Sequence, residues 1–426
     1  MHFFRKNFII SIIMHFMANG DVYKVHIDSI ASGGDALGRI DGKPVFITGG
    51  APDETVHCRI VEDRNTWARA EILEIIEPSP VRCEPVCAFY GKCGGCNLQH
   101  IDYNAQLRIK AAILKDSFLR IGGINPLEIE VFSSPPYEYR NRMQFHCLRD
   151  KQNSPRNAHL RCTADYRGKN TSEHKYGLKG RASEVIIPVN DCPIAVPEIR
   201  EILQSVNSIS IPPEKDRFTV FAKDEVLLNE GGQQRGKIKL LEKEITIDAG
   251  LFFQSNCFML EKLILELQKI AEGVNRDLLM ADLYCGVGTF ALFLGDMFPK
   301  VILAEENKAA VSLARENLRG VTTEFFALRD TNWPDQLFRK KDNQSVFGFM
   351  VVDPPRAGLA PKLAITLAQN GPAVLIYVSC DPASLARDSK ILVKGGYTLK
   401  ELKLFDFYPQ TAHIESLAVY TRNAYC

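Results

Sequence analysis

The stretch Asp282–Phe290 reads DLYCGVGTF and has the pattern of a strand end, a glycine turn and the start of a helix. Around it the chain alternates helical segments with strands that are apolar throughout, which read LLMADLYC, KVILAEE, GFMVVDPP and AVLIYVSC. A strand that is apolar on both faces is buried on both faces, as in a parallel sheet covered by helices. Residues 249–426 are therefore predicted to form an α/β domain.

Acidic residues occur at the ends of successive strands of this predicted sheet. Glu305 follows VILA, and Asp353 follows GFMVV and precedes two prolines that fix the next turn. In doubly wound sheets an acid at the position of Glu305 binds ribose hydroxyls, at the edge where ligands bind. The turn after Asp282 lacks the third glycine of a dinucleotide motif, so it fits S-adenosylmethionine as well as a nucleotide. Each acid could instead only cap a helix.

Cys380 follows the apolar strand AVLIYVS and precedes a helix that opens at Asp381 and Pro382. A thiol at a helix N-terminus is expected to have a lowered pKa and a larger thiolate fraction. The alternative is a buried structural cysteine. Because Cys380 falls on the same sheet edge as the acids, we favour a nucleophile.

A histidine and a carboxylate, His413 and Glu415, precede the last apolar strand in the stretch FDFYPQTAHIESLAVY, residues 405–420. A carboxylate in that place is either part of a solvated strand edge or a proton acceptor held in a site. The pattern of residues leaves both possibilities open.

Four cysteines have a spacing typical of an iron–sulfur site. Cys87, Cys93 and Cys96 lie together in a turn-rich stretch, and Cys192 precedes a proline far downstream. This arrangement is near the plant-type ferredoxin spacing, so an iron–sulfur cluster is predicted. Zinc is the alternative, but structural zinc sites use two short pairs and the chain has no second pair. Cys83 could compete as a ligand, and its spacing fits less well.

The N-terminal part has a different rhythm. Residues 21–77 alternate short β-rich segments with turn clusters such as SGGDALG and GGAPDE, which predicts a small β-barrel. Residues 18–80 hold six Lys/Arg against eleven Asp/Glu, so a contact with RNA would use one face or loop. A core-facing helix that ends at Gly122-Gly123 is predicted from helical spacing of apolar residues, namely Leu107, Ala111, Leu114 and Phe118.

The segment Tyr137–Arg181 is basic. It holds eleven Lys/Arg against four Asp/Glu, with five interleaved aromatic residues: Tyr137, Tyr139, Phe145, Tyr166 and Tyr176. Basic side chains neutralise phosphates and aromatic faces stack unpaired bases. A solvated surface loop is the alternative, and we favour an RNA-contacting surface.

Length and composition set the remaining limits. A chain of 426 residues with net charge +1 has room for roughly three domains, and its overall charge does not indicate a partner. No apolar run reaches 18 residues, so no membrane span is expected. Residues 1–17 resemble a secretion signal only faintly, and we favour an over-extended translation start and a reducing cytoplasm. The remaining cysteines are expected to be buried hydrophobes: Cys58, Cys147, Cys162, Cys257, Cys285 and Cys426.

Five motifs resemble, in order, those of the RNA uracil-5 methyltransferases: FFQSN, DLYCGVGTF, VVDPPRAGL, YVSCDPASLARD and DFYPQTAHIES. GDALGRIDGKPVFITGGAPDETV resembles a TRAM domain, and the cysteine spacing is similar to the branch that acts on large-subunit ribosomal RNA. The chain departs from the family in DPAS, where Asn and Thr are commoner, and in room for an inserted basic loop at residues 150–181.

The resemblance implies an α/β fold with three parts. These are an OB-like TRAM barrel (17–78), a central iron–sulfur and RNA-contacting domain (79–100 and 128–248), and a Rossmann-like class I methyltransferase domain (101–127 and 249–426). It implies a monomer that binds RNA, with no membrane partner, and S-adenosylmethionine and a 4Fe-4S cluster as cofactors.

The resemblance also assigns residues. Cys380 matches the family's nucleophile and Glu415 its base, which makes the carboxylate before the last strand a proton acceptor. The matching cofactor-binding positions are Gln254, Tyr284, Thr289, Glu305, Asp330 and Asp353, and the matching cluster ligands are Cys87, Cys93, Cys96 and Cys192. Addition of a thiolate at C6 activates C5 of uracil, and a base must then remove the C5 proton. The uridine must leave its stack to reach Cys380.

Other functions remain as alternatives to a 23S ribosomal RNA (uracil-5) methyltransferase. A transfer-RNA uridine is one. An RNA cytosine-5 methyltransferase would carry a second cysteine in a Pro-Cys step, where this chain reads DPPR. An amino-group methyltransferase would place an aromatic residue where Arg356 stands, and a non-catalytic RNA-binding protein would not need Cys380 and Glu415.

Overall fold

The computed structural model describes residues 18–126, 128–147, 176–204, 215–338 and 347–422. Contacts divide the chain into two compact units, Met1–Cys83 with His100–Asp102, and Glu84–Gln99 with Tyr103–Cys426. The N-terminal segment 1–17 and most of the inserted basic loop, with Tyr166 and Cys162, lie outside the described residues. No helix of the described residues is long and apolar enough to span a membrane.

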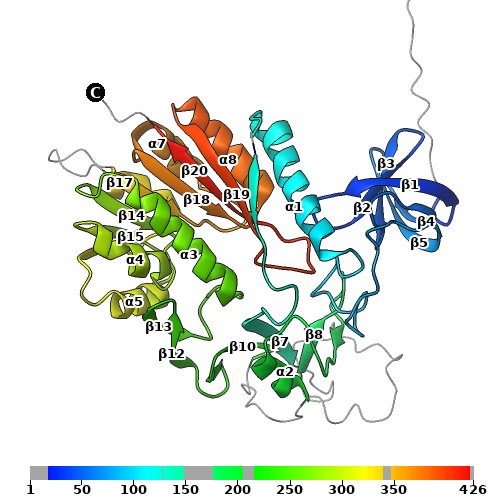
Figure 1. The fold of residues 1–426 in the computed structure, drawn as a ribbon, viewed down its shortest axis with the longest axis horizontal. Coiled ribbons are helices and arrows are strands. Elements are labelled where there is room, and N and C mark those ends of the chain that lie inside the picture. Colours follow the sequence, from blue (N-terminus) through cyan, green and yellow to red (C-terminus); the bar gives the residue numbers. More distant parts are fainter. Residues whose placement is uncertain (1–17, 127, 148–175, 205–214, 339–346, 423–426) are drawn as a thin grey trace, which may run out of the picture. The chain divides into compact units, whose positions relative to one another are not determined.

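The first unit is a closed five-stranded barrel (Figure 1). Its strands pair in the order β1-β2-β3-β5-β4, and alternate residues such as Val25 and Ile27 point into a fully buried core. The predicted barrel is therefore confirmed. Its strands are β1 (Val22–Ile30), β2 (Ala36–Ile40), β3 (Lys43–Thr48), β4 (Thr55–Asp63) and β5 (Ala68–Glu77).

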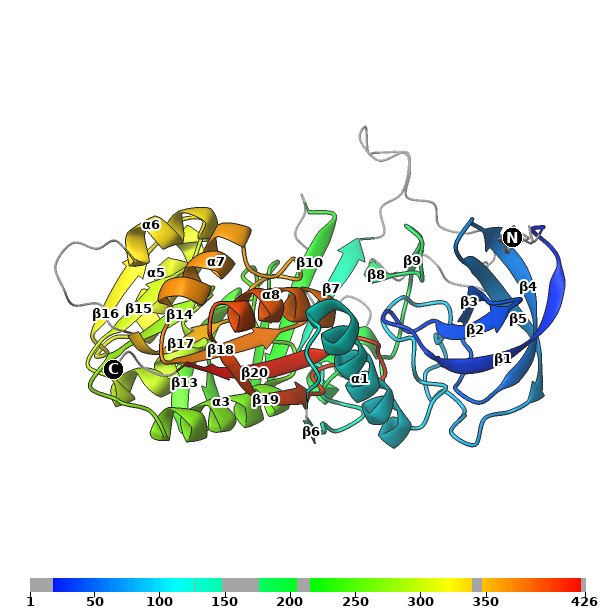
Figure 2. The ribbon, with the colours of Figure 1, turned by 90° about the horizontal axis from the view of Figure 1, so that it is seen from above.

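The second unit is built on an eight-stranded sheet of order β16-β15-β14-β17-β18-β20-β19-β6. The strands β14 to β18 are parallel, as their apolar sequences predict, and β20 runs antiparallel to both β18 and β19, which lie beside it (Figure 2). The strands are β6 (Ile129–Phe132), β14 (Leu279–Leu283), β15 (Val301–Ala304), β16 (Thr323–Phe326), β17 (Phe347–Val352), β18 (Val374–Ser379), β19 (Thr398–Phe405) and β20 (Glu415–Thr421).

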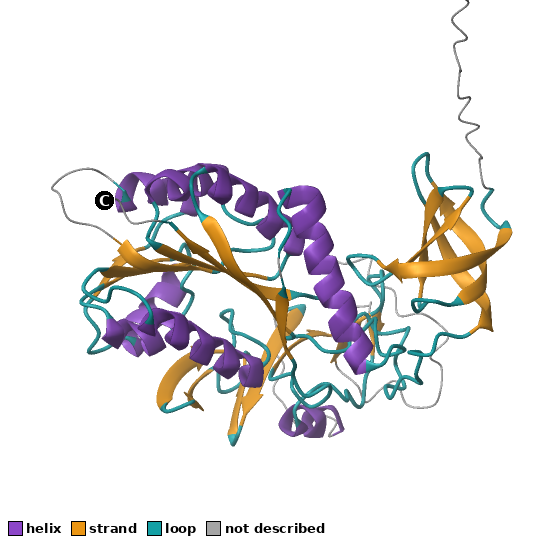
Figure 3. Cartoon of the chain, turned by 45° about the horizontal axis from the view of Figure 1, so that its top comes forward, coloured by secondary structure: helices purple, strands orange, loops and turns teal. Residues whose placement is uncertain are grey.

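Helices cover both faces of this sheet (Figure 3). One apolar core joins the sheet to α3, α4 and α5, and a second core joins its other face to α1, α6, α7 and α8. The predicted α/β class is confirmed. The helices are α1 (Tyr103–Ser117), α3 (Cys257–Glu272), α4 (Thr289–Leu294), α5 (Lys308–Asn317), α6 (Trp333–Leu337), α7 (Pro361–Asn370) and α8 (Pro382–Lys394).

The predicted core-facing helix is confirmed, since Leu114 and Phe118 are fully buried, but part of its buried face differs from the prediction. A short π-helical turn, Phe118–Gly122, follows it, and Gly123 ends the helical run with a left-handed φ of 65°. Leu107 and Ala111 are only half-buried, whereas Gln106 and Lys110 are fully buried. The buried face is rotated because these two polar side chains have partners elsewhere in the unit.

A smaller antiparallel sheet of order β11-β10-β7-β8-β9 packs with α2, and β12 pairs with β13. Tyr139, Phe145 and Tyr176 of the basic segment lie in its core, with Phe145 and Tyr176 ring to ring at 5.3 Å. The expectation that these aromatics stack on bases is wrong, because they are core residues. These elements are β7 (Arg142–Cys147), β8 (Tyr176–Lys179), β9 (Ile186–Ile187), α2 (Pro197–Gln204), β10 (Arg217–Lys223), β11 (Val226–Asn229), β12 (Arg235–Leu240) and β13 (Lys243–Asp248).

Candidate active site

The parallel strands bring the predicted site residues to one edge of the large sheet. Leu283 at the end of β14 pairs with Ala304 of β15 and Val352 of β17, and Val352 pairs with Tyr377 of β18. The residues that leave these strands therefore share the carboxyl edge, where open α/β sheets bind ligands. They are Tyr284, Glu305, Asp353 and Cys380.

The glycine turn after β14 is held by the acid after β15. Glu305 accepts the N–H of Gly286 at 3.1 Å through Oε2 and the N–H of Asn307 at 2.8 Å through Oε1. Tyr284 and Gly286 both have left-handed φ values, 61° and 53°, which bend the chain sharply over the strand end. The carboxylate of Glu305 is half-buried and fixed beside this turn.

Tyr284 also links the turn to the segment after β16. Its hydroxyl donates to Asp330 Oδ2 at 3.0 Å, and its ring meets Trp333 edge-on at 4.6 Å between centroids. Asp330 begins a short 3-10 turn, and Thr289 is the half-buried first residue of α4. Asp330 is thus hydrogen-bonded directly to Tyr284 at the end of β14, and Thr289 lies at the end of the glycine turn.

Two predicted or strand-end residues of this unit each have a buried oxygen without a partner among the described residues. Asp282 accepts the N–H of Ala291 through Oδ2, but its Oδ1 has no hydrogen bond among the described residues, and the same is true of Gln254 Oε1. Burial is the main cause that raises the pKa of Asp282 to about 8 and the pKa of Asp353 to about 7. Such groups are costly in a closed core and suit a site that a polar ligand completes.

Cys380 and Glu415 lie opposite one another. β20 is antiparallel to β18 with Ser416 opposite Ser379, so the next step of the register sets Glu415, the first residue of β20, beside Cys380. Cys380 is half-buried and Glu415 is 3% exposed. Residues 35 positions apart in sequence therefore meet at the strand ends.

The electrostatics of this pair correct one sequence-based expectation. The pKa of the Cys380 thiol is raised to about 11, by burial first and then by the carboxylates of Glu415 and Asp353, while Arg356 opposes the shift. The helix N-terminus is already occupied, because the Asp381 side chain caps α8 by accepting the N–H of Ser384. The expected lowering of the thiol pKa is therefore wrong for the free protein.

Burial and Asp353 likewise raise the pKa of Glu415 well above its usual value, and Arg356 acts against them. Arg356 therefore favours the ionised form of both groups of the pair. It donates to His413 Nδ1 at 3.3 Å, and His413 accepts as a neutral ring because burial and nearby cations lower its pKa to about 4. This role of Arg356 was not predicted from the sequence, where the DPPR motif was the available signal.

The four predicted cluster cysteines come together in the same unit. Their thiols lie within electrostatic range of one another: burial and the neighbouring cysteines raise the pKa of Cys96 to about 11 and that of Cys192 to about 12. All four are free thiols, and Arg140 lies close enough to Cys93, Cys96 and Cys192 to oppose these shifts. Within the described ranges no group of three His, Cys, Asp or Glu side chains is arranged to hold a metal ion.

The other cysteines follow their expected roles where they are described. Cys58, Cys147, Cys257 and Cys285 are buried, whereas Cys83 is exposed and belongs to the barrel unit, where its N–H donates to the carbonyl of His100. Cys426 lies outside the described residues.

Comparison of the sequence and fold with those of known proteins shows to which family this chain belongs. Residues 235–423 match the sequence model described as tRNA (Uracil-5-)-methyltransferase, and residues 18–73 match that of the TRAM domain. A protein of Treponema denticola named "Uncharacterized RNA methyltransferase" is 33% identical over 414 residues, which cover 90% of this chain and 95% of that protein. The chain belongs to the RNA uracil-5 methyltransferase family. This confirms the family and the TRAM barrel predicted from the motifs.

A second relative and one solved structure also match most of this RNA uracil-5 methyltransferase. A second "Uncharacterized RNA methyltransferase", from Aquifex aeolicus, is 30% identical and covers 93% of this chain and 97% of its own length. The crystal structure of the Pyrococcus abyssi tRNA (uracil-54, C5)-methyltransferase in complex with S-adenosyl-L-homocysteine has a TM-score of 0.66. It is 24% identical and covers 94% of this chain and 100% of that one, which shows that the two share a fold.

Proposed function

We propose that this RNA uracil-5 methyltransferase methylates C5 of a uridine in 23S ribosomal RNA through a covalent bond between Cys380 and C6 of the base. The observation that carries the proposal is the position of Cys380 opposite Glu415 at the carboxyl edge of the sheet. A nucleophile and a proton acceptor in reach of one base are what C5 methylation requires.

The chain's own residues perform the steps before and after methyl transfer. Cys380 loses its proton and its sulfur bonds to C6, which moves electron density to C5. S-adenosylmethionine, when bound, supplies the methyl group that C5 takes. The Glu415 carboxylate then accepts the C5 proton, the electron pair of that C–H bond restores the C5–C6 double bond, and the Cys380 thiolate leaves. Arg356 supports both steps because it favours the ionised thiol and the ionised carboxyl.

The unpartnered polar atoms fit a methyl donor with an amino-acid and a ribose part. Gln254 Oε1 and Asp282 Oδ1 are buried acceptors without partners among the described residues, and the half-buried Glu305 lies beside the glycine turn. We propose that the cofactor is held by residues that match the family's positions: Gln254, Tyr284, Thr289, Glu305, Asp330 and Asp353.

The RNA is proposed on the resemblance of the TRAM barrel and the cysteine spacing to the ribosomal branch. A transfer-RNA uridine is the second candidate, and the fold shared with the Pyrococcus abyssi tRNA (uracil-54, C5)-methyltransferase favours it. The test is to map 5-methyluridine in both RNAs from a strain lacking the gene, with and without the gene restored. Loss from 23S ribosomal RNA alone supports the first candidate, and loss from transfer RNA alone establishes the second.

A second experiment, with purified protein, can exclude other reactions. Purified protein incubated with RNA carrying tritium at uridine C5 should release tritium in step with methylation. Release from RNA labelled at cytidine C5 instead would establish a cytosine-5 enzyme, and no release from either base would exclude methylation at C5.

We also propose that Cys87, Cys93, Cys96 and Cys192 hold a 4Fe-4S cluster. The support is the spacing of the four cysteines, all of which are free thiols, and the electrostatic influence of Cys93 and Cys96 on the thiol of Cys192. Protein purified without oxygen should be brown and contain about four irons per chain. A colourless protein with one zinc would overturn this assignment.

A further inference from the structure

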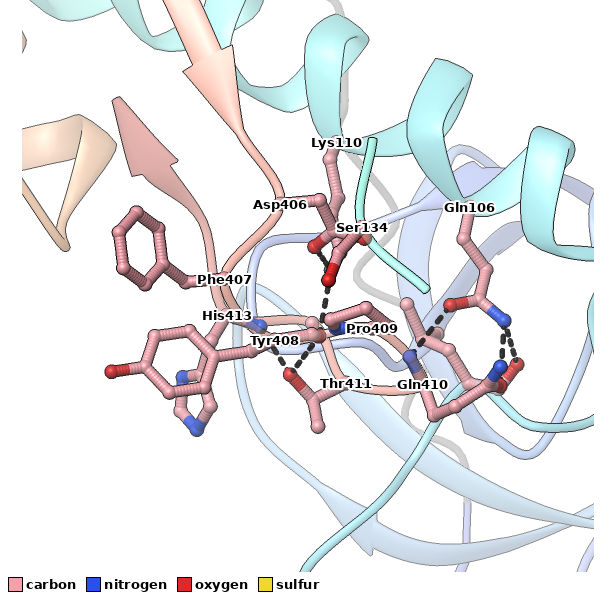
Figure 4. A network of polar contacts seen from close by, with 12 residues as sticks. Gln106, Lys110, Ser134, Asp406, Phe407, Tyr408, Pro409, Gln410, Thr411 and His413 are labelled. Atoms are coloured by element: carbon pink, nitrogen blue, oxygen red, sulfur yellow. Dashed lines mark hydrogen bonds and ion pairs between the residues drawn. The ribbon is translucent and has the colours of Figure 1, made fainter. Parts of the chain in front are cut away.

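The loop Asp406–Ile414 joins β19 to β20 and ends at the residue before Glu415 (Figure 4). No hydrogen bond to the Glu415 carboxylate is found among the described residues. The position of this carboxyl group therefore depends on the backbone of Glu415, which pairs with Phe405 as the first residue of β20 and continues directly from this loop. Two other segments of the same unit bind this loop.

Helix α1 binds the start of the loop through a buried ion pair. Lys110 Nζ donates to Asp406 Oδ1 at 2.6 Å and to the carbonyl of Tyr408 at 2.9 Å. Both side chains of the pair are completely buried. Burial lowers the pKa of Lys110, and Asp406 opposes that shift.

One turn earlier on α1, Gln106 binds the middle of the loop in both directions. Its Oε1 accepts the N–H of Gln410 and its Nε2 donates to Gln410 Oε1, each at 2.9 Å. The same Nε2 donates to the carbonyl of Leu98 at 3.0 Å. Neither glutamine is more than 3% exposed, so water cannot replace these bonds.

The segment that follows Cys96 binds the loop from another direction. The N–H groups of Asn97 and Leu98 both donate to the carbonyl of Gln410, at 3.1 and 3.0 Å. Asn97 Oδ1 accepts the N–H of Ala412 at 2.8 Å. Gln410 is therefore the point where α1 and the cysteine segment meet.

Gln410 has a backbone conformation that needs such support. Its φ is +68°, a left-handed value that costs a residue with a side chain free energy, commonly of order 1–3 kcal/mol for strained backbone. Beyond it, the His413 N–H donates to Thr411 Oγ1, and the Thr411 hydroxyl donates to the carbonyl of Tyr408. The shape of the loop is thus determined by bonds from α1 and from the segment after Cys96, which meet at Gln410, and by bonds within the loop.

We propose that Gln106 and Gln410 are positioning residues for the proton-transfer step: they hold the loop Asp406–Ile414 so that the Glu415 carboxyl group faces the base bound to Cys380. This inference rests on the proposed function. Cys380 lies between β18 and α8 and not on the loop. Loosening the loop should therefore slow removal of the C5 proton and leave the attack of Cys380 on C6 unchanged.

The test is Gln106→Ala in the full-length protein, with Gln268→Ala as the matched control. Gln268 is a half-buried helical glutamine that donates to the carbonyl of Phe293, away from the loop. The proteins are mixed with S-adenosylmethionine and labelled RNA from the strain lacking the gene. Formation and decay of the covalent protein–RNA adduct are followed on denaturing gels.

For Gln106→Ala we expect adduct formation within about twofold of wild type and adduct release slowed by about tenfold or more, part of the 10²–10⁴ that a placed base contributes. Gln106→Glu keeps the bond from the Gln410 N–H and should show an intermediate rate of release. Gln268→Ala should resemble wild type in both steps. Equal slowing of both steps, or unchanged release, would overturn the inference.

A second measurement does not depend on turnover. In Gln106→Ala, amide hydrogen exchange should become faster in peptides that cover residues 406–414 and remain unchanged in β14 and β15. Unchanged exchange in residues 406–414 would also overturn the inference. If wild-type protein forms no adduct and no 5-methyluridine, the proposed function fails, and the exchange result then reports on the loop alone.

Discussion

The carboxyl edge of the large sheet and the loop Asp406–Ile414 are both polar and largely buried, yet their buried polar groups differ in whether they have hydrogen-bond partners. At the edge, Asp282 Oδ1 and Gln254 Oε1 have no partners within the described chain, and burial raises the pKa of Asp282 to about 8. In the loop, the N–H, carbonyl and side-chain oxygen of Gln410 all have partners at 2.9–3.1 Å.

This contrast distinguishes a region that binds a ligand from a region that holds a catalytic residue in place. A buried polar group without a partner costs about 1–3 kcal/mol, a penalty that a ligand can remove when it binds. The bonds that converge on Gln410 instead hold the middle of the loop in one shape, although Asp406 Oδ2 in the same loop has no hydrogen bond among the described residues. The edge is therefore suited to bind a ligand, and the loop is suited to hold Glu415 in position.

The largest effect is expected at the edge. Cys380→Ala should abolish both the covalent adduct and methylation, because the base cannot be activated without the thiolate. Binding of S-adenosylmethionine, measured by calorimetry, should stay at the wild-type level since the proposed cofactor residues are unchanged. Methylation near the wild-type rate would refute the nucleophile.

Glu415→Gln should stop the reaction at a later step, after methyl transfer. Glutamine is similar in size but cannot accept the C5 proton, so the methylated base should remain bound to Cys380. The adduct should accumulate as a denaturation-resistant band and not decay. If Glu415→Gln forms no adduct while remaining folded, Glu415 acts earlier than the proposal states.

The same contrast explains what could be predicted from the sequence. The strand-end residues were accessible because apolar strands of a parallel sheet end at one edge, so Glu305, Asp353 and Cys380 could be placed together from local patterns. The pairing of Glu415 with Cys380 was available only by resemblance, because it depends on the antiparallel insertion of β20 between β18 and β19.

The supporting contacts could not be predicted in this way. Gln106 and Lys110 interrupt an apolar pattern, and their partners Gln410 and Asp406 are about 300 residues away. Helical spacing therefore selected Leu107 and Ala111 as the buried face. The predicted direction of the Cys380 pKa shift was wrong for a related reason. A helix N-terminus can be recognised in the sequence, whereas the approach of two carboxylates to Cys380 cannot.

Within the paired region, Lys110→Met should reduce stability by about 3–5 kcal/mol, since it leaves Asp406 buried without a cation. The double variant Lys110→Met/Asp406→Leu should recover most of this loss because no charge remains to desolvate. Denaturant unfolding monitored by circular dichroism measures both. As a control, Lys300→Met breaks an exposed pair with Glu324 and should cost about 0–1 kcal/mol.

The smallest effect concerns the charges around Cys380, whose pKa of about 11 leaves mostly thiol at neutral pH in the free protein. Alkylation of Cys380 by iodoacetamide should therefore accelerate by about tenfold per pH unit until that pKa is approached. Arg356→Gln removes a cation that favours the thiolate. The pKa of the Cys380 thiol should therefore rise, and its alkylation at pH 9 should slow.

Glu415→Gln removes an anion that disfavours the thiolate, so the pKa of Cys380 should fall and alkylation at the same pH should accelerate. A shift of about one unit corresponds to a change of about tenfold in thiolate fraction. Mass spectrometry of the peptide that contains Cys380 separates it from the other cysteines, and Cys257 serves as the internal reference because it is buried. Unchanged alkylation rates in both variants would show that burial alone sets the thiol pKa, and that Arg356 and Glu415 do not tune the nucleophile.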